Sequence, residues 1–210
     1  MPVAIADHAQ GEPWHAYPEP AYTTRERHSM AKESPFVDSA LELAQSILLP
    51  PLSLQRSASL LYQIAVDNEL SLTVDPKSPR RGTSAFQTDL CVFETKRAGI
   101  VIPRVVLEFK TRITTHDVLT YSTKARKHKQ VYPYLRYGLV MSEEPHIAGR
   151  VFNHNEALDF AVAVGGYSIA AFKELLAHLL NEEIAASREL EAIFFGSAKR
   201  RLFRSAVVAS

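Results

Sequence analysis

Two acidic residues and a lysine in the middle of the chain have side chains and spacings suited to phosphodiester chemistry. In the run VVLEFKT, residues 105–111, Glu108 and Lys110 are two apart, so on a strand they point to one face and their apolar neighbours to the other. Asp89 precedes Glu108 by nineteen residues. Opposed carboxylates repel each other unless a cation lies between them, and oxygen ligands suit Mg²⁺ or Mn²⁺. The alternative interpretation is a charged strand face that is simply solvated.

The lysine and the surrounding charge both favour an anionic substrate. A lysine two residues from a metal-binding carboxylate could orient or deprotonate an attacking water and stabilise the charge that develops on a phosphate. Residues 76–136 contain 13 Lys and Arg against four Asp and Glu, a net charge of +9, and the rest of the chain has 11 against 19, or −8. The total of +1 hides this division. A basic segment favours a polyanion such as nucleic acid, with a solvated charged surface as the alternative.

A predicted β-hairpin would bring the two acids together. Two β-rich runs flank residues 98–99, which are Ala and Gly. If the turn is centred between them, opposed residue numbers sum to 197, and Asp89 faces Glu108 across the ladder. In the same register, Lys110 faces Gln87. This pairing depends on the register, because a slip of one residue would move every side chain to the other face.

The segments before the hairpin have helical and turn patterns. Residues 34–49 predict a helix that stops at the prolines of positions 50–51. Residues 53–70 have apolar side chains at helical spacing and predict a second helix, followed by a short strand over 71–75. Residues 75–83 predict a loop.

After the hairpin, helices and strands alternate. Pro103 favours a bulge within the second hairpin strand. Thr114 with Asp117 forms a capping-box pattern, and the helix that it starts should end near Tyr132, before a proline. Residues 136–142 predict a buried strand. The order of elements predicts an α/β domain with a mixed sheet.

This order of elements and acids resembles the PD-(D/E)XK nuclease superfamily, which includes many restriction endonucleases and repair nucleases. The matching residues are Asp89 and the run Glu108–Lys110, within residues 53–142. The proline that usually precedes the aspartate is Thr88 here. The resemblance implies a restriction-endonuclease-like αβββαβ core with a central mixed sheet and additional C-terminal helices.

The resemblance also implies a metal site. Asp89 and Glu108 would bind Mg²⁺, with Mn²⁺ as an alternative, and the backbone carbonyl of Phe109 would be a further ligand. Members of the superfamily often use a glutamate of the first helix as an additional contact. Glu69 is the first candidate for that role and Glu42 the second.

Two further roles follow from the resemblance. Lys110 would be the catalytic lysine. The run from Gln130 to Tyr134 is similar to the Gln-x-x-x-Tyr signature of the exonuclease branch, in which the glutamine supports the site. Pro133 inside this run departs from the signature, so the role implied for Gln130 is firmer than that for Tyr134.

Basic side chains outside the acid pair are candidate phosphate contacts. They lie in the loop before the hairpin and on the helix after it: Arg80, Arg81, Lys124, Lys127 and Lys129. These helix residues do not all share a face, so some of them are solvated charges instead.

The rest of the chain suggests its organisation. Residues 1–35, rich in proline and without periodicity, predict an extended arm, and residues 36–210 predict a single domain with a helical C-terminal part over 167–204. Ser168 could cap a long helix whose leucine-rich stripe either completes the core or forms a dimer. The single cysteine excludes a disulfide framework. With no secretory signal and no run of about 18 apolar residues, a cytoplasmic protein without membrane spans is expected.

Taken together, the sequence predicts a metal-dependent phosphodiesterase that cleaves DNA, most simply a type II restriction-like endonuclease. Such an enzyme would act as a homodimer and could have a cognate methyltransferase as a partner. The first alternative is a non-catalytic nucleic-acid-binding or assembly module on a degenerate nuclease fold. The second is a protein-interaction domain that uses the leucine stripe. Cleavage by one or by two metals, and endonuclease or exonuclease action, stay open.

Overall fold

A computed structural model describes residues 33–81 and 84–200 of the chain. Residues 1–32 of the predicted arm and residues 201–204 of the predicted helical part lie outside the described residues. The described part is a mixed α/β fold with a five-stranded mixed sheet, as the sequence predicts, and a separate two-stranded sheet.

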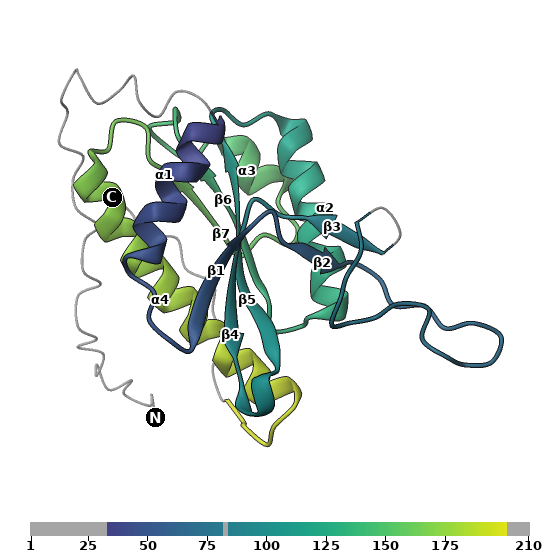
Figure 1. The fold of residues 1–210 in the computed structure, drawn as a ribbon. Helices are drawn as coiled ribbons and strands as arrows, with labels where there is room; N and C mark the ends of the chain where they lie inside the picture. Colours follow the sequence, from purple (N-terminus) through teal and green to yellow (C-terminus); the bar gives the residue numbers. More distant parts are fainter. Residues whose placement is uncertain (1–32, 82–83, 201–210) are drawn as a thin grey trace, which may run out of the picture.

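The central sheet has the strand order β1-β4-β5-β6-β7 (Figure 1). The strands are β1 Leu52–Arg56, β4 Leu90–Thr95, β5 Val101–Lys110, β6 Arg136–Met141 and β7 Phe160–Ala163. β1, β4 and β5 pair antiparallel, whereas β5, β6 and β7 pair parallel. The C-terminal end of β5 and the N-terminal end of β4 therefore lie side by side. The predicted acids are at these strand ends.

The β4–β5 hairpin has the predicted register at these strand ends. Leu90 pairs with Leu107, so opposed residue numbers sum to 197 there. The register shifts by one between Val92 and Phe93, opposite Pro103, which confirms the predicted bulge. The short 3₁₀ helix η1, Arg97–Gly99, makes the turn, and beside it Thr95 pairs with Val101, so the sum there is 196 and the predicted turn centre is wrong. The bulge restores the sum of 197 before the acids.

One prediction from this register is wrong. Gln87 does not face Lys110, because the chain leaves the hairpin ladder before Leu90. Gln87 instead ends β3, Ala85–Gln87, which pairs with β2, Ser59–Leu61, in the separate sheet.

Helices cover both faces of the central sheet (Figure 1). Helices α1, Glu33–Gln45, and α4, Ile169–Phe194, pack on one face, against a core that includes Phe109. Helices α2, Thr115–Val131, and α3, Gly149–His154, lie on the other face, with β2 and β3. Because side chains alternate along β5, Leu107 and Phe109 enter the first core while Glu108 points toward α2.

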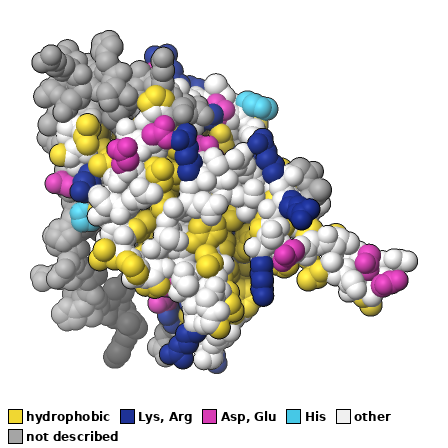
Figure 2. Space-filling view, viewed as in Figure 1, with side chains coloured by type: hydrophobic (Ala, Val, Ile, Leu, Met, Phe, Trp, Pro, Cys, Tyr) yellow, Lys and Arg dark blue, Asp and Glu magenta, His cyan; other side chains and the backbone are white. Residues whose placement is uncertain are grey.

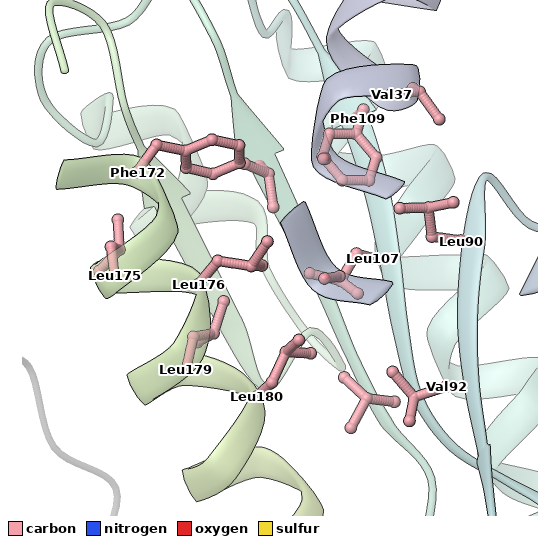
Figure 3. Close-up of a cluster of buried hydrophobic side chains, with 14 of the residues drawn as sticks. Val37, Leu90, Val92, Leu107, Phe109, Phe172, Leu175, Leu176, Leu179 and Leu180 are labelled. Carbon is pink, nitrogen blue, oxygen red and sulfur yellow. The ribbon is translucent and has the colours of Figure 1, made fainter. Parts of the chain in front are cut away.

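The leucine-rich stripe of α4 completes the core (Figure 3). Ser168 caps the helix, since its Oγ accepts a hydrogen bond from the N–H of Ala171 at 3.2 Å. The buried side chains of the stripe are Phe172, Leu175, Leu176, Leu179 and Leu180. Each such burial contributes about 2 kcal/mol. The stripe is buried within this chain. It therefore does not support the alternatives in which it forms a dimer or binds a partner protein.

The predicted second helix, over residues 53–70, is wrong. This segment forms β1 and β2 and then a loop, because β1 pairs along its whole length with β4 and this tertiary pairing overrides the weak helical pattern. The predicted strand over 71–75 is also absent, and Leu72 makes only an isolated bridge to Val66. Figure 1 shows that the loop between β2 and β3 extends away from the body of the molecule.

The other predicted elements are present, although the first helix ends at Gln45 and not at the prolines of positions 50–51. Thr114 and Asp117 make both hydrogen bonds of a capping box, and Tyr132 is the C-cap of α2. The buried strand predicted over 136–142 is β6. Within the described residues, no helix is both long and apolar enough to cross a membrane.

Candidate active site

The hairpin ties the two predicted acids to each other's strands. The backbone N–H of Asp89 donates a hydrogen bond to Oε2 of Glu108 at 3.3 Å. In return, the N–H of Phe109 donates to Oδ2 of Asp89 at 2.8 Å. The hairpin therefore places both carboxylates together at the end of β5, where the register predicts them.

Glu108 is a buried acid, which excludes a solvated strand face at this position. Its exposed fraction is 1%. Its pKa is raised from 4.5 to about 7, mainly by burial and also by the charge of Asp89, while Lys124 and the hydrogen bond from Tyr137 lower it. A carboxylate in this environment gains stability from an added cation.

Tyr137, which sequence reasoning missed, contacts Glu108 directly. Its hydroxyl donates a hydrogen bond to Oε1 of Glu108 at 2.5 Å. Burial, followed by the charge of Glu108, raises the pKa of Tyr137 well above 10, so the phenol stays protonated. The buried ring of His128 stacks on it with centroids 5.6 Å apart. The parallel pairing of β5 with β6 puts Tyr137 beside Val106, on the same face as Glu108, and this pairing is not visible in the local sequence.

Two lysines lie near one aromatic ring, that of Tyr121, and one of them contacts the acid pair. The Nζ of Lys124 lies 3.4 Å from Oε1 of Glu108. The ring of Tyr121 has this Nζ at 5.0 Å from its centroid and the Nζ of Lys110 at 5.8 Å. Lys110 thus shares the strand face of Glu108, and Lys124, predicted only as a phosphate contact, contacts Glu108 directly. Tyr121 was not predicted.

Local structure on both sides of the site fixes its geometry. The capping box at Thr114 starts α2 four residues after Lys110, so the first turns of the helix pass over the end of β5. Thr88, the departure from the family pattern, is buried, and both its N–H and its Oγ1 donate to the carbonyl of Ala58, at 2.9 and 3.1 Å. Thr88 therefore anchors the chain immediately before Asp89.

The acid pair and a nearby backbone carbonyl are oxygen donors that could hold a metal ion. Because the N–H and C=O of one strand residue point to the same side, the carbonyl of Phe109 faces the side of Asp89, like its N–H. The carbonyl of Lys110 points the other way and accepts from the N–H of Ser142 at 2.9 Å. Two carboxylates and one carbonyl form an all-oxygen donor set that fits Mg²⁺, which usually keeps several waters.

No third acidic side chain from the part of the chain that the structure describes joins this set. Among the described residues, no group of three or more His, Cys, Asp and Glu is arranged to hold a metal ion. Glu69 is exposed on the projecting loop rather than on a helix, where its N–H donates to Oδ1 of Asp67. Glu42 is exposed on α1, which covers the opposite face of the sheet.

The structure does not bring Gln130 to the acid pair. Gln130 is exposed, and it lies six residues beyond Lys124, about 9 Å further along α2 and away from Lys110. Tyr134 is buried elsewhere, with the guanidinium of Arg104 5.5 Å from its ring centroid. The two ends of the predicted signature therefore lie in different surroundings.

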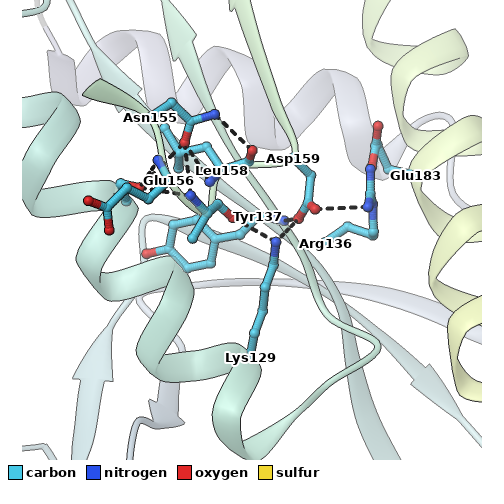
Figure 4. Close-up of polar contacts among 10 residues, drawn as sticks. Lys129, Arg136, Tyr137, Asn155, Glu156, Leu158, Asp159 and Glu183 are labelled. Carbon is cyan, nitrogen blue, oxygen red and sulfur yellow. Dashed lines mark hydrogen bonds and ion pairs between the residues drawn. The ribbon is translucent and has the colours of Figure 1, made fainter. Parts of the chain in front are cut away.

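Several predicted phosphate contacts have other partners. Lys129 lies 2.6 Å from Asp159 and donates to the carbonyl of Ala157, in a network that joins α2, β6, β7 and α4 (Figure 4). Arg81 donates to Oε1 of Gln87 at 2.8 Å. Arg80 is exposed and Lys127 is half-buried. On the face shown in Figure 2, basic side chains are separated by uncharged surface instead of forming one patch.

A second buried charge cluster lies between the other end of the hairpin and α4. Arg104 is fully buried and contacts Glu94 at 2.6 Å and Glu191 at 2.5 Å. Arg188 also contacts Glu94, at 2.8 Å. Arg104 belongs to the segment that is basic in sequence, yet its charge is used inside the chain.

Comparison with known proteins leaves the site to be interpreted from its own geometry. No protein-family model matches the chain, and a search of curated proteins finds no relative of it.

Proposed function

We propose that this chain is a divalent-metal-dependent nuclease of restriction-endonuclease-like fold that cleaves DNA. The observation that carries the proposal is the pairing of Asp89 with buried Glu108, with Lys110 two residues further along the same strand face. The strand order and the mixed pairing of the central sheet support the fold assignment.

Asp89, Glu108 and the carbonyl of Phe109 would hold the metal. A bound Mg²⁺ supplies positive charge for the phosphate and lowers the pKa of a coordinated water. The two strands of the hairpin position these donors in advance, because hydrogen bonds from the backbone of each strand fix the carboxylate of the other.

Lys110 would act on the substrate. Its ammonium group can hold the attacking water and donate to a non-bridging phosphate oxygen, on which charge increases in the transition state. In the hydrolysis, the water oxygen bonds to phosphorus, the bond from phosphorus to the leaving sugar oxygen breaks, and that oxygen takes up a proton. Tyr121 lies under Lys110 and limits the directions in which its ammonium can point.

A type II restriction-like enzyme needs two such sites to cut both strands. The proposal therefore includes a homodimer, formed by a surface other than the buried stripe of α4. A methyltransferase that protects the recognition sequence belongs to the same proposal.

The test is cleavage of supercoiled plasmid and linear DNA with Mg²⁺, Mn²⁺ or EDTA, comparing the wild type with Asp89→Asn and Lys110→Met. Lys173→Met is the matched control, because it removes one positive charge from the exposed surface of α4, on the opposite face of the sheet. Discrete metal-dependent fragments that both site variants lose would support the proposal. Progressive shortening would instead favour exonuclease action.

Two other results would change the conclusion. Salt-sensitive DNA binding without cleavage would favour the non-catalytic module. Neither cleavage nor binding would overturn the nuclease proposal.

A further inference from the structure

Lys124 places a positive charge beside the buried carboxylate of Glu108. Its Nζ lies 3.4 Å from Oε1, the same oxygen that accepts the hydrogen bond of Tyr137. The Lys124 side chain is 25% exposed and that of Glu108 only 2%, so the ammonium reaches the carboxylate from the solvent side. A ligand that approaches Glu108 from solvent meets this ammonium.

The contact between Lys124 and Glu108 is long, so another cation can replace the ammonium. A charge-assisted N–H···O bond is usually about 2.7–2.9 Å long, and this one is longer. Lysine has a flexible four-carbon stem. The ring of Tyr121 lies under both Lys124 and Lys110, so an ammonium can move across the ring face and keep its cation–π contact.

We propose that Lys124 is a built-in counter-ion, which stays on Glu108 in the metal-free protein and moves to the bound phosphodiester when a divalent cation binds the two carboxylates. This inference rests on the nuclease function proposed above. It assigns to Lys124 a regulatory role besides phosphate contact: the ammonium competes with the metal until DNA offers it another anion.

The proposal has two consequences for metal binding, one without DNA and one with DNA. Without DNA, removal of Lys124 removes a competitor, so the metal should bind more tightly. With DNA, the released ammonium gains a phosphate partner, so metal and DNA should strengthen each other's binding equally, as linkage requires. A purely structural Lys124 predicts neither effect.

The first measurement is Mn²⁺ binding to the full chain without DNA, followed by electron paramagnetic resonance. Lys124→Met should bind Mn²⁺ roughly tenfold more tightly than the wild type, the factor expected for loss of one nearby charge in a partly solvated site. Lys127→Met, one helical turn away, should stay within about twofold. Lys124→Gln should reproduce the effect if the methionine variant folds poorly. Unchanged or weaker binding in a folded Lys124 variant would overturn the inference.

The second measurement adds a short DNA duplex in a Lys110→Met background, which keeps the DNA intact. DNA should tighten Mn²⁺ binding in both proteins, because the metal itself contacts the phosphate, but the tightening should be roughly tenfold larger when Lys124 is present than when it is methionine. Equal coupling with and without Lys124 would contradict the inference.

Asp89→Asn separates this inference from the proposed function. If Asp89→Asn abolishes Mn²⁺ binding and cleavage while Lys124→Met behaves like Lys127→Met, only the role of Lys124 is wrong. If Mn²⁺ binding does not depend on Asp89, the nuclease proposal fails, and the inference fails with it.

Discussion

Two buried glutamates on adjacent strands of one sheet have opposite electrostatic surroundings. Glu94, on β4, is 7% exposed and lies between the guanidinium groups of Arg104 and Arg188. Burial raises its pKa, but hydrogen bonds from Arg188 and Arg104 outweigh burial and leave the pKa below 4.5. Glu108, on β5, is more deeply buried and faces another carboxylate and one loosely placed ammonium, and its pKa is about 7.

This difference separates a structural ion pair from a candidate active site. The charge of Glu94 is neutralised by the chain itself, so the cluster links β4, β5 and α4 and gains nothing from a ligand. The charge of Glu108 is only partly compensated, so an added cation would stabilise it. Strongly perturbed acids of this second kind are the ones that mark functional sites.

The largest expected effect is on cleavage. Glu108→Gln should reduce the rate of plasmid cleavage by about 10²–10³-fold, because an amide cannot replace the carboxylate as a metal ligand. Glu94→Gln is the matched control on the adjacent strand and should leave the rate per folded molecule within about twofold. Initial rates at saturating Mg²⁺ test both, and equal losses in the two variants would remove the distinction between the glutamates.

The next effect is on stability, and here the substitution of Glu94 should cost more than that of Glu108. Glu94→Gln should lower the free energy of unfolding by about 3 kcal/mol at pH 7, because it leaves fully buried Arg104 with one carboxylate partner fewer. Urea unfolding measures this loss. A cost below about 1 kcal/mol would show that Glu191 alone compensates Arg104.

The pH dependence of stability should differ in sign between the two glutamates. The pKa of Glu108 rises from 4.5 to about 7 on folding, so the folded state binds the extra proton and loses stability as pH rises between these values. In metal-free protein, Glu108→Gln should therefore be more stable than the wild type by about 3 kcal/mol at pH 8 and equal to it below about pH 4.5.

The Glu94 variant should show the reverse trend. The pKa of Glu94 is lowered by folding, so its stabilising contribution is present at neutral pH and is lost as pH falls through the folded-state pKa. The cost of Glu94→Gln should shrink in acid. Urea unfolding in EDTA at several pH values measures the free energy of unfolding of both variants. If the difference from the wild type changes with pH in the same direction in both variants, the two glutamates do not have opposite pKa shifts.

The smallest effect concerns the helix caps on the two faces of the sheet. Thr114→Ala at the start of α2 and Ser168→Ala at the start of α4 should each cost about 1 kcal/mol of stability. Only Thr114→Ala should also slow cleavage, because α2 carries Tyr121 and Lys124. Thermal melts and plasmid assays on the same samples measure both, and slower cleavage in Ser168→Ala would show a general effect of lost stability.

Patterns within short segments predicted much of the fold correctly. The capping box at Thr114 and the cap at Ser168 depend on neighbouring residues, so their signals are local. The register near Leu90 depends on the turn together with the bulge at Pro103, and the sequence favoured this bulge. The helix predicted over 53–70 was wrong because β1 gains its stability from β4, which is more than thirty residues away in sequence.

In the candidate site, too, some features follow from local sequence and others only from the tertiary structure. Alternation along a strand determined by itself that Glu108 and Lys110 share one face, and the spacing around a hairpin predicted that Asp89 lies opposite Glu108, a pairing that also needs the bulge at Pro103. Only the tertiary structure decided that Tyr137 and Lys124 reach Glu108, while Lys129 and Gln130 do not. The physical reason is that the parallel crossover through α2 places β6 beside β5, and neither the position nor the rotation of that helix is encoded in any short segment.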